Sequence, residues 1–311
     1  VYNDQVRQYV NMYANKRRLS VSKMLGLSEM YFPLFEEQLA KHNLPMELKY
    51  LPIIESALNP TAKSRAGAMG LWQFMYGTGK MYGLKVTSYI DERCDPYQST
   101  VAACEYLHFL YDMFGDWQLV IAGYNCGPGN INKAIRRSGG KTTYWEIRPY
   151  LPRETQGYVP AFIAAAYIFN YAAEHNLYER EPLKTFFQVD TVMIKEQIAF
   201  QQISKVVDIS VDELKFLNPQ YKRLVIPHIE GEKHSLVLPN SKIGSFITNE
   251  KAIYDYIRND SSLAKMMPPK DLMKVITVKQ GERMNTIANR YKCTVGDIMA
   301  WNNLKAAKLR T

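Results

Sequence analysis

The sequence predicts a mainly α fold in which a large helical domain precedes small α+β modules. Through about residue 180, apolar residues recur every three or four positions and strand signals are weak. Beyond that point, short β-branched runs such as FFQVDTVMI and HSLVLP occur among helical stretches. A pattern of helix, turn and helix also occurs twice, which indicates two related modules.

Four helices of the first part can be placed from apolar spacing and from their end residues. Val6, Val10 and Tyr13 share one helical stripe, and a second stripe, in SVSKMLGLSEMYFPLFEEQLAKHN, stops at His42. The stretch DPYQSTVAACEYLHFLYDMFG begins with an N-capping aspartate before proline and ends on Gly115, so it predicts a third helix. The fourth, PAFIAAAYIFNYAAEHN at 160–176, again opens on proline and is apolar nearly all round, which predicts a buried helix.

Length and composition indicate an ordinary globular protein with more than one domain. The 311 residues exceed the ~100 to 200 of a common domain. Apolar residues make up 47% and charged residues 22%. The longest apolar runs, such as IAAAYIF, fall far short of the ~20 residues that a bilayer span needs. We therefore expect no segment that crosses a membrane.

The formal charge of +9 favours an anionic partner. The basic residues are scattered, however, with KRR at 16–18 and RR at 136–137 the densest clusters, and no nucleic-acid motif accompanies them. A solvated basic surface is therefore the favoured interpretation, and nucleic acid is not an expected partner.

The cysteines show no pattern of a metal site. Cys94, Cys104, Cys126 and Cys293 have neither CxxC nor Cys/His ligand spacing. We expect free thiols, no metal and no cofactor, although four cysteines could form two disulfides.

The repeat lies in the last third of the chain. QQISKVVDISVDELKFLNP at 201–219 aligns without gaps on the stretch MNTIANRYKCTVGDIMAWNN, because Ile203 pairs with Ile287 and Val211 with Val295 at one offset, 287 minus 203, or 84. Each copy predicts a helix, a turn led by Ser or Thr, and a second helix ending on Asn. MMPPKDL, between the copies, is typical of a linker.

One acidic residue stands out in the stretch ESALNPTAKSRAGAMGLWQFM. The preceding segment, NLPMELKYLPIIES, predicts a short helix that begins at Pro45 and ends near Ser56. Glu55 would then lie in the last turn, where the helix dipole favours the protonated carboxyl, and apolar neighbours such as Ile54 would desolvate it. Both effects raise its pKa toward that of a general acid. The alternative is a solvent-facing glutamate paired with a lysine.

The segment after Glu55 predicts a ligand site. Its loop has little side-chain bulk, which would let the backbone approach a ligand closely. Gln73, beside Trp72 and Met75, would offer hydrogen bonds to a sugar together with an apolar wall. The small loop residues are Ser64, Gly67, Ala68 and Gly70.

This segment resembles the signature of lytic transglycosylases of the soluble type, lysozyme-like enzymes that cleave peptidoglycan. Two further blocks, GYNCGPGNINKAI and LPRETQGYVPAFIAA, resemble the same family at family-like spacing. Tyr76, where the family usually has Pro, and Cys126, where it has a small residue, depart from the pattern without removing a group that the chemistry needs. The matching positions are Glu55, Ser56, Pro60, Ala62, Ser64, Gly67, Ala68, Gly70, Leu71, Trp72, Gln73, Phe74 and Met75.

The resemblance extends over essentially the whole chain and implies its organisation. Residues 1–182 are expected to form a lysozyme-like domain of the goose and soluble-transglycosylase type. Residues 183–265 would form a degenerate LysM-like module with a helical linker. Residues 272–311 resemble a LysM glycan-binding module whose closing strand we expect to be missing. The upstream residues 44–53 and these modules indicate the membrane-bound branch of the family.

The resemblance implies cleavage of the β-1,4 bond between N-acetylmuramic acid and N-acetylglucosamine with Glu55 as the single catalytic carboxylate, first acid and then base. The muramic acid 6-hydroxyl would attack and leave a 1,6-anhydro sugar. Matching positions imply roles for six substrate-binding residues. Ser64 and Gln73 would hydrogen-bond the sugars, Met75 would line the glycan wall, Tyr124 and Asn125 would contact substrate, and Tyr158 would orient Glu55.

Two other functions are compatible with the sequence, and the resemblance also implies a partner and a cellular location. A goose-lysozyme-like hydrolase on the same fold would leave hydrated ends, and a non-catalytic protein would bind glycan through its LysM copies. The resemblance implies peptidoglycan strands as partner, a monomer, and a periplasmic location in the bacterial cell envelope. A lipid anchor upstream of Val1 would attach the protein to the outer membrane, as in some relatives.

Overall fold

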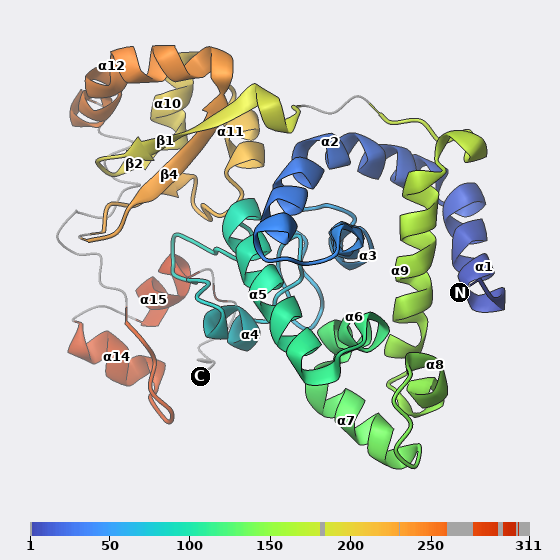
Figure 1. Cartoon of the computed structure of the whole chain (residues 1–311). Coiled ribbons are helices and arrows are strands. Elements are labelled where there is room, and N and C mark those ends of the chain that lie inside the picture. Colours follow the sequence, from blue (N-terminus) through green and yellow to red (C-terminus); the bar gives the residue numbers. More distant parts are fainter. Residues whose placement is uncertain are drawn as a thin grey trace. The chain divides into compact units, whose positions relative to one another are not determined.

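The computed structural model describes residues 2–180, 184–229, 231–259, 276–291, 295–302 and 304. Two compact units can be distinguished, one made of Val1–Leu84 with Arg93–Gln188 and the other of Lys85–Glu92 with Val189–Thr311. Helices dominate both, and the named strands of the described residues all belong to the second unit (Figure 1). The predicted mainly α class is therefore confirmed.

The first unit is built from helices. Within its described residues, none is long and apolar enough to span a bilayer, and the same holds for the second unit. In chain order they are α1 (Asp4–Asn11), the π-helix η1 (Met12–Lys16), α2 (Arg18–Lys41), the 3-10 helix η2 (Met46–Tyr50), α3 (Leu51–Ser56), α4 (Tyr76–Met81), α5 (Pro96–Phe114), α6 (Trp117–Cys126), α7 (Pro128–Arg137), α8 (Tyr144–Ile147), η3 (Arg148–Tyr150), α9 (Thr155–Asn170), η4 (Ala173–His175) and η5 (Phe186–Gln188).

The caps predicted for α5 are confirmed. The Asp95 carboxylate accepts the backbone N–H groups of Tyr97 and Gln98 at 2.9 and 3.0 Å, and Gly115 ends the helix in the left-handed conformation. The stop predicted at His42 is also found, since α2 ends at Lys41. These end residues act locally, which is why the sequence could place them.

The expected start of α9 was wrong, because this helix begins at Thr155 and Pro160 lies inside it. A proline removes the hydrogen bond to the carbonyl four residues earlier, here that of Gln156. That oxygen instead accepts the Tyr144 hydroxyl at 2.9 Å and Arg148 Nε at 2.7 Å. These two side chains compensate the lost bond, so the helix continues through the proline.

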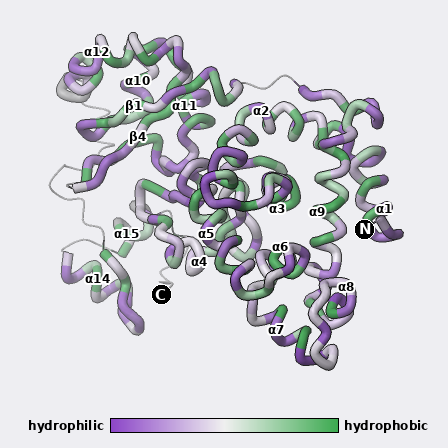
Figure 2. Tube along the Cα trace, viewed as in Figure 1, coloured by the Kyte–Doolittle hydropathy of each residue, from purple (hydrophilic) through white to green (hydrophobic). Residues whose placement is uncertain are grey.

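The core of the first unit surrounds Trp72. Its indole is fully buried, lies 5.3 Å from the Phe35 ring, and donates through Nε1 to Thr100 Oγ1 at 2.9 Å. Helix α6 packs against both α5 and α9, and α1 packs on α9. Figure 2 shows hydrophobic residues along α9, in keeping with the burial of its inner face. The core therefore fixes the segment that follows Glu55.

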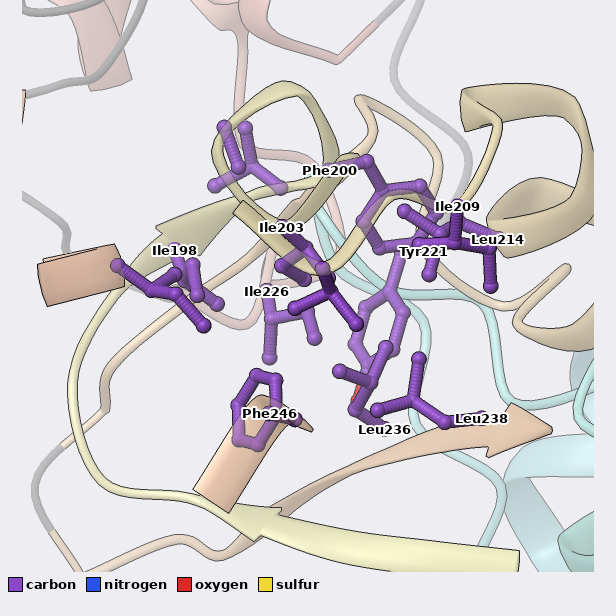
Figure 3. Close-up of a cluster of buried hydrophobic side chains, with 14 of the residues drawn as sticks. Ile198, Phe200, Ile203, Ile209, Leu214, Tyr221, Ile226, Leu236, Leu238 and Phe246 are labelled. Carbon is purple, nitrogen blue, oxygen red and sulfur yellow. The ribbon is translucent and has the colours of Figure 1, made fainter. Parts of the chain in front are cut away.

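The second unit joins short sheets to helices. Strand β1 (Val189–Ile194) pairs antiparallel with β4 (His234–Pro239), and β2 (Ile198–Ala199) pairs with β3 (Val225–Ile226). Helices α10 (Phe200–Val207), α11 (Val211–Leu217) and α12 (Asn240–Asn259) complete this part. Figure 3 shows its buried core, in which Ile203, Leu236 and Phe246 come from α10, β4 and α12.

Residues 85–92, although they interrupt the first unit in sequence, belong to the core of the second. Tyr89 and Ile90 are buried in its hydrophobic cluster. The Asp91 N–H donates to the Gln220 carbonyl at 2.9 Å, and the Lys222 N–H donates to the Tyr89 carbonyl at 2.8 Å. The sequence had suggested that this segment belongs to the first domain, because its partners at Gln220 and Lys222 are far away along the chain.

Both copies of the sequence repeat form the two predicted helices, and the residues 292–294 between the helices of the second copy lie outside the described part. The first copy is α10 and α11, and the second is α14 (Met284–Arg290) and α15 (Val295–Trp301). Ser210 caps α11 by accepting the Glu213 N–H at 3.1 Å. The predicted linker MMPPKDL and Cys293 lie outside the described residues.

Candidate active site

Glu55 occupies the last turn of α3. The helix ends there because Ala57 and Leu58 both have positive φ angles, 52° and 58°, and their N–H groups donate back to the carbonyls of Ile53 and Pro52 at 3.2 Å each. The predicted end near Ser56 is confirmed, while the predicted single helix from Pro45 is divided into η2 and α3. The Glu55 side chain is thereby held at a helix terminus.

Glu55 lines a cavity of about 390 Å³. Burial raises the pKa of its carboxyl from 4.5 to about 7, the Tyr158 hydrogen bond lowers it, and the charge of Glu154 raises it. The upward shift expected from the sequence is therefore present, and desolvation is its main cause. A carboxyl with this pKa can both give and accept a proton near neutral pH.

Tyr158, on α9, donates its hydroxyl hydrogen to Glu55 Oε1. Burial, followed by the charge of Glu55, raises the pKa of this tyrosine well above its usual range, so the hydroxyl stays protonated. Next to it, Gly157 has no Cβ, and one built there would overlap the hydroxyl oxygen of Tyr9 on α1. The glycine therefore permits α1 to pack closely beside the residue that holds Glu55.

Hydrogen bonds to the backbone fix the run Leu71-Trp72-Gln73 beside Glu55. The Ser56 hydroxyl donates to the Leu71 carbonyl at 2.9 Å, and the Tyr124 hydroxyl donates to the Trp72 carbonyl at 2.8 Å. Burial, then the charge of Glu55, raises the pKa of Tyr124 well above its usual range. Tyr124 is thus close enough to Glu55 for the charge of that carboxyl to raise its pKa, and the Tyr124 hydroxyl is hydrogen-bonded to the backbone.

Gln73 and Ser64 line the same cavity as Glu55. Gln73 has a φ of 50°, and its amide Nε2 donates to the carbonyls of Gly70 and Ala62 at 2.8 and 3.1 Å. The Ser64 oxygen accepts the Ala68 N–H at 2.9 Å, which leaves its own hydrogen available for donation. The two side chains therefore present one acceptor and one donor.

The role expected for Gly70 was wrong. It has a φ of 86°, and a Cβ built on it would overlap the carbonyl oxygen of Arg93. Its small size permits a close approach between two backbone segments of the protein, in place of the approach to a ligand that the sequence suggested. Arg93 also donates to the carbonyls of Gly67 and Phe74 at 3.1 and 3.3 Å, which fixes both sides of this loop.

Asn125 and Met75 are not among the residues that line the cavity. The Asn125 oxygen accepts the Thr155 hydroxyl at 2.8 Å, one helical turn before Tyr158, and within the described chain it makes no hydrogen bond to Glu55. Met75, 45% exposed, precedes α4. The structure thus brings Glu55, Ser64 and Gln73 together in the cavity. Tyr158 and Tyr124 hold Glu55 and the neighbouring backbone, and Asn125 and Met75 lie outside this group.

Sequence reasoning missed one wall of the cavity. This wall comes from η1 and the start of α2 and includes the basic residue Arg17. A second basic residue, Lys63, comes from the loop after Glu55. No sequence motif marked these positions. A π-helix often occurs at a functional site, but the five residues of η1 have the composition of an ordinary helix and gave no signal of it. The missed residues are Met12, Tyr13, Arg17, Ser20, Met24 and Lys63.

Other acidic groups and metal ligands give no competing site in the described residues. Among the side chains that line the cavity, all of them described, Glu55 is the one acid. Glu154 is exposed just before α9, and Glu146 is paired with the Thr143 hydroxyl at 2.7 Å and with Lys141 at 3.3 Å. Within the described ranges, no three His, Cys, Asp or Glu side chains gather in a form that could hold a metal.

Three family models match this chain. Residues 32–147 match the transglycosylase SLT domain, residues 188–255 the LysM-like domain of lytic transglycosylase MltD, and residues 276–311 the LysM domain. The crystal structure of the 70 kDa soluble lytic transglycosylase from Escherichia coli aligns with a TM-score of 0.42 and 26% identity, over 58% of this chain and 33% of that one.

Two curated relatives from Escherichia coli (strain K12) are similar in sequence. The soluble lytic murein transglycosylase is 34% identical over 38% of this chain and 19% of its own length. The membrane-bound lytic murein transglycosylase D is 32% identical over 313 aligned residues, which span 99% of this chain and 67% of that protein. With the SLT domain followed by both LysM-type matches, the chain belongs to the membrane-bound lytic murein transglycosylase D family.

Proposed function

We propose that the chain cleaves the β-1,4 bond between N-acetylmuramic acid and N-acetylglucosamine in peptidoglycan and leaves a 1,6-anhydro end. Its family is that of lytic murein transglycosylases, and the relatives' names give murein as their substrate. The observation that supports the finer mechanism is Glu55, an acid with a pKa of about 7 that is the one carboxyl among the described lining residues of its cavity.

In the first step, protonated Glu55 donates its proton to the glycosidic oxygen as the bond to the muramic acid C1 breaks. Tyr158 holds Oε1, which leaves Oε2 to carry the proton toward the substrate. The developing cation at C1 would be stabilised by the substrate's own N-acetyl group. Ordinary glycosidases use a second carboxylate ~5 to 9.5 Å away for this purpose, and substrate-assisted enzymes are the known exception.

In the second step, the 6-hydroxyl of the same muramic acid attacks C1 and transfers its proton to the Glu55 carboxylate. The new bond closes the 1,6-anhydro ring, Glu55 returns to its protonated form, and no water is consumed. The Tyr158 hydrogen bond stabilises the ionised carboxylate between the two steps. Because the pKa of Glu55 is near 7, neither giving up the proton nor taking it back is strongly unfavourable at neutral pH. A second carboxylate that activated water would favour hydrolysis instead.

The other predicted residues take supporting roles in this proposal. Ser64 donates and Gln73 accepts hydrogen bonds from sugar substituents inside the cavity, in line with the groups that each leaves free. Tyr124 keeps the Trp72 backbone in place, Asn125 binds substrate through its amide beside α9, and Met75 contributes an exposed apolar surface.

The two LysM-type matches are proposed to bind glycan strands and to retain the enzyme on the cell wall. We propose the division into a catalytic domain at 1–182 and modules at 183–265 and 272–311. The name of the membrane-bound relative supports a location in the bacterial cell envelope, and we propose the periplasm with a lipid anchor. Removal of residues 180–311 should then weaken binding to isolated sacculi, and unchanged binding would contradict this targeting role.

Mass spectrometry of digested peptidoglycan tests the activity. Wild type should release muropeptides with 1,6-anhydro ends, and Glu55→Gln, which is isosteric and cannot ionise, should release essentially none. Hydrated reducing ends from the wild type would identify a hydrolase of the goose-lysozyme type. A Glu55→Gln variant that digests at the wild-type rate would refute the catalytic assignment.

A further inference from the structure

The cavity around Glu55 has a cationic side that the transglycosylase signature does not include. Arg17 and Lys63 both line it, together with Glu55. Arg17 precedes the matched SLT segment, residues 32–147, so this wall is built by the N-terminal helices of this chain.

The backbone around Arg17 is irregular. Its N–H donates to the Met12 carbonyl at 2.9 Å, an i to i−5 bond that closes the π-helix, and its own φ and ψ of −118° and 27° separate η1 from α2. Tyr13 is buried beneath, and the charge of Arg17 acts against the burial that raises the pKa of Tyr13 to about 12. Arg17 therefore occupies the break between the two helices, and it lines the cavity from this position.

The neighbouring arginine shows the contrast between a structural cation and a free one. Arg18 is anchored by hydrogen bonds to three carbonyls, those of Ala14 at 2.7 Å, His175 at 3.1 Å and Asn176 at 2.6 Å. Arg17, by comparison, is exposed, and its guanidinium takes part in no ion pair or hydrogen bond within the described part of the chain. Its charge is therefore available to a ligand.

Lys63 supplies the second charge from the loop after Glu55. A β-bridge pairs its backbone with Met69, and the preceding residue, Ala62, accepts the Gln73 amide at 3.1 Å. The side chain is exposed and, among the described residues, has neither an acidic partner nor a hydrogen bond. A fixed backbone thus presents a second cation to the same cavity.

These two charges are not neutralised by the acid of the cavity. The pKa of Glu55 is about 7, so near neutral pH a large share of its carboxyl is uncharged and does not offset the two basic side chains. An uncompensated pair of cations favours an anion, and guanidinium groups in particular bind carboxylates. Peptidoglycan offers a carboxylate on the lactyl arm of muramic acid where no peptide is attached, and carboxylates on the peptide where one is joined to that arm.

We propose that Arg17 and Lys63 form a carboxylate-binding subsite beside Glu55, which selects glycan whose muramic acid bears an anionic lactyl or peptide group. This inference rests on the proposed function and adds to it the feature of the substrate that positions the scissile bond. The two residues bind substrate and take no part in proton transfer.

The test compares kcat/KM on three glycan preparations: strands with intact peptides, strands stripped of peptides so that lactyl carboxylates are exposed, and strands whose carboxyls have been converted to neutral amides. The Arg17→Gln/Lys63→Gln variant is compared with wild type. The matched control is Lys16→Gln/Arg65→Gln, which removes the same charge from two exposed positions that do not line the cavity. Thermal unfolding confirms that each variant is folded.

We expect the cavity variant to lose about fivefold in kcat/KM on anionic strands, chiefly through KM, since an exposed charge pair contributes only modestly to binding. A loss on peptide-bearing strands alone identifies a peptide carboxylate, and a loss on stripped strands identifies the lactyl group. On amidated strands, wild type and variant should be equal.

Equal kcat/KM for wild type and cavity variant on all strands would overturn the proposal, as would a loss of the same size on amidated strands or in the surface control. Anhydro products from the wild type establish the proposed function separately. A failure of the subsite with those products present is therefore distinct from a failure of the proposed function.

Discussion

Tyr158 and Glu55, 103 residues apart in the chain, are joined by a hydrogen bond from the tyrosine hydroxyl to Oε1 of the carboxyl. This bond favours the ionised form of Glu55, whereas burial favours the protonated form. Burial is the larger effect, so the pKa settles at about 7. The two residues come from separate blocks of the sequence, and the fold brings them together because α9 packs against α3.

Replacing Tyr158 with phenylalanine should raise the pKa of Glu55 further, because the group that stabilises the carboxylate is lost. The high-pH limb of kcat/KM should move up by about one pH unit. The rate should fall roughly 10- to 100-fold, since the acid loses its orientation. A pH profile measures both effects. Tyr124→Phe is the control, because that hydroxyl binds the Trp72 backbone, and an equal displacement in both variants would disprove the assignment.

Glu55 should also make the free energy of unfolding depend on pH. Its folded-state pKa, about 7, lies above the unfolded value of 4.5, so between these pH values the native state binds more protons. The free energy of unfolding of wild type should therefore fall as pH rises from 4.5 to 7, by roughly 2 to 3 kcal/mol relative to Glu55→Gln. Above about pH 8, where Glu55 is ionised in both the folded and the unfolded state, the difference should be constant. Denaturant unfolding at several pH values measures this, and a pH-independent difference would contradict the raised pKa.

Glu154→Gln tests whether a second carboxylate takes part in the reaction. Glu154 is close enough for its charge to raise the pKa of Glu55, but it is exposed. Removing that charge should move the high-pH limb of kcat/KM down by a few tenths of a pH unit, a screened effect, and leave the rate within about twofold. Steady-state rates across pH measure it. A loss of about a thousandfold would instead mark Glu154 as a catalytic base.

Two glycine substitutions separate backbone strain from a steric clash near the site. Gly70 and Gly83 have similar φ angles, 86° and 80°, but a Cβ meets the Arg93 carbonyl at the first and open space at the second. Gly83→Ala should cost about 1 kcal/mol from its left-handed conformation. Gly70→Ala should cost about 3 kcal/mol or more, because a buried backbone must also move. Denaturant unfolding measures both, and equal losses would show that the clash is relieved at little cost.

Short-range chemistry made much of this molecule predictable. The cap at Asp95, the stop at Gly115 and the break after Ser56 depend on neighbouring residues alone, and all three are found. The repeat was visible because both copies place their helices at the same offset, with α10 and α14 starting at 200 and 284 and α11 and α15 starting at 211 and 295. The acid itself was identifiable because Glu55 stands alone in a long stretch without other carboxyls.

Features that depend on tertiary contacts could not be predicted in the same way. Pro160 continues a helix only because Tyr144 and Arg148 satisfy the Gln156 carbonyl. Gly70 serves a backbone contact with a residue 23 positions away, 93 minus 70. Arg17 reaches the cavity through a π-helix that no apolar spacing signals. In the first two cases the deciding partner lies outside the local segment, and in the third a local change of helix type leaves no signal in the residue pattern.

Digestion in water enriched in oxygen-18 tests the central claim most directly, because the proposed attack by the 6-hydroxyl consumes no water. Strands cleaved by wild type should end in 1,6-anhydro muramic acid without the heavy isotope, and Glu55→Gln should produce no new ends. Reducing ends that carry oxygen-18, formed at the rate of strand cleavage, would show that water is the nucleophile and would contradict the mechanism.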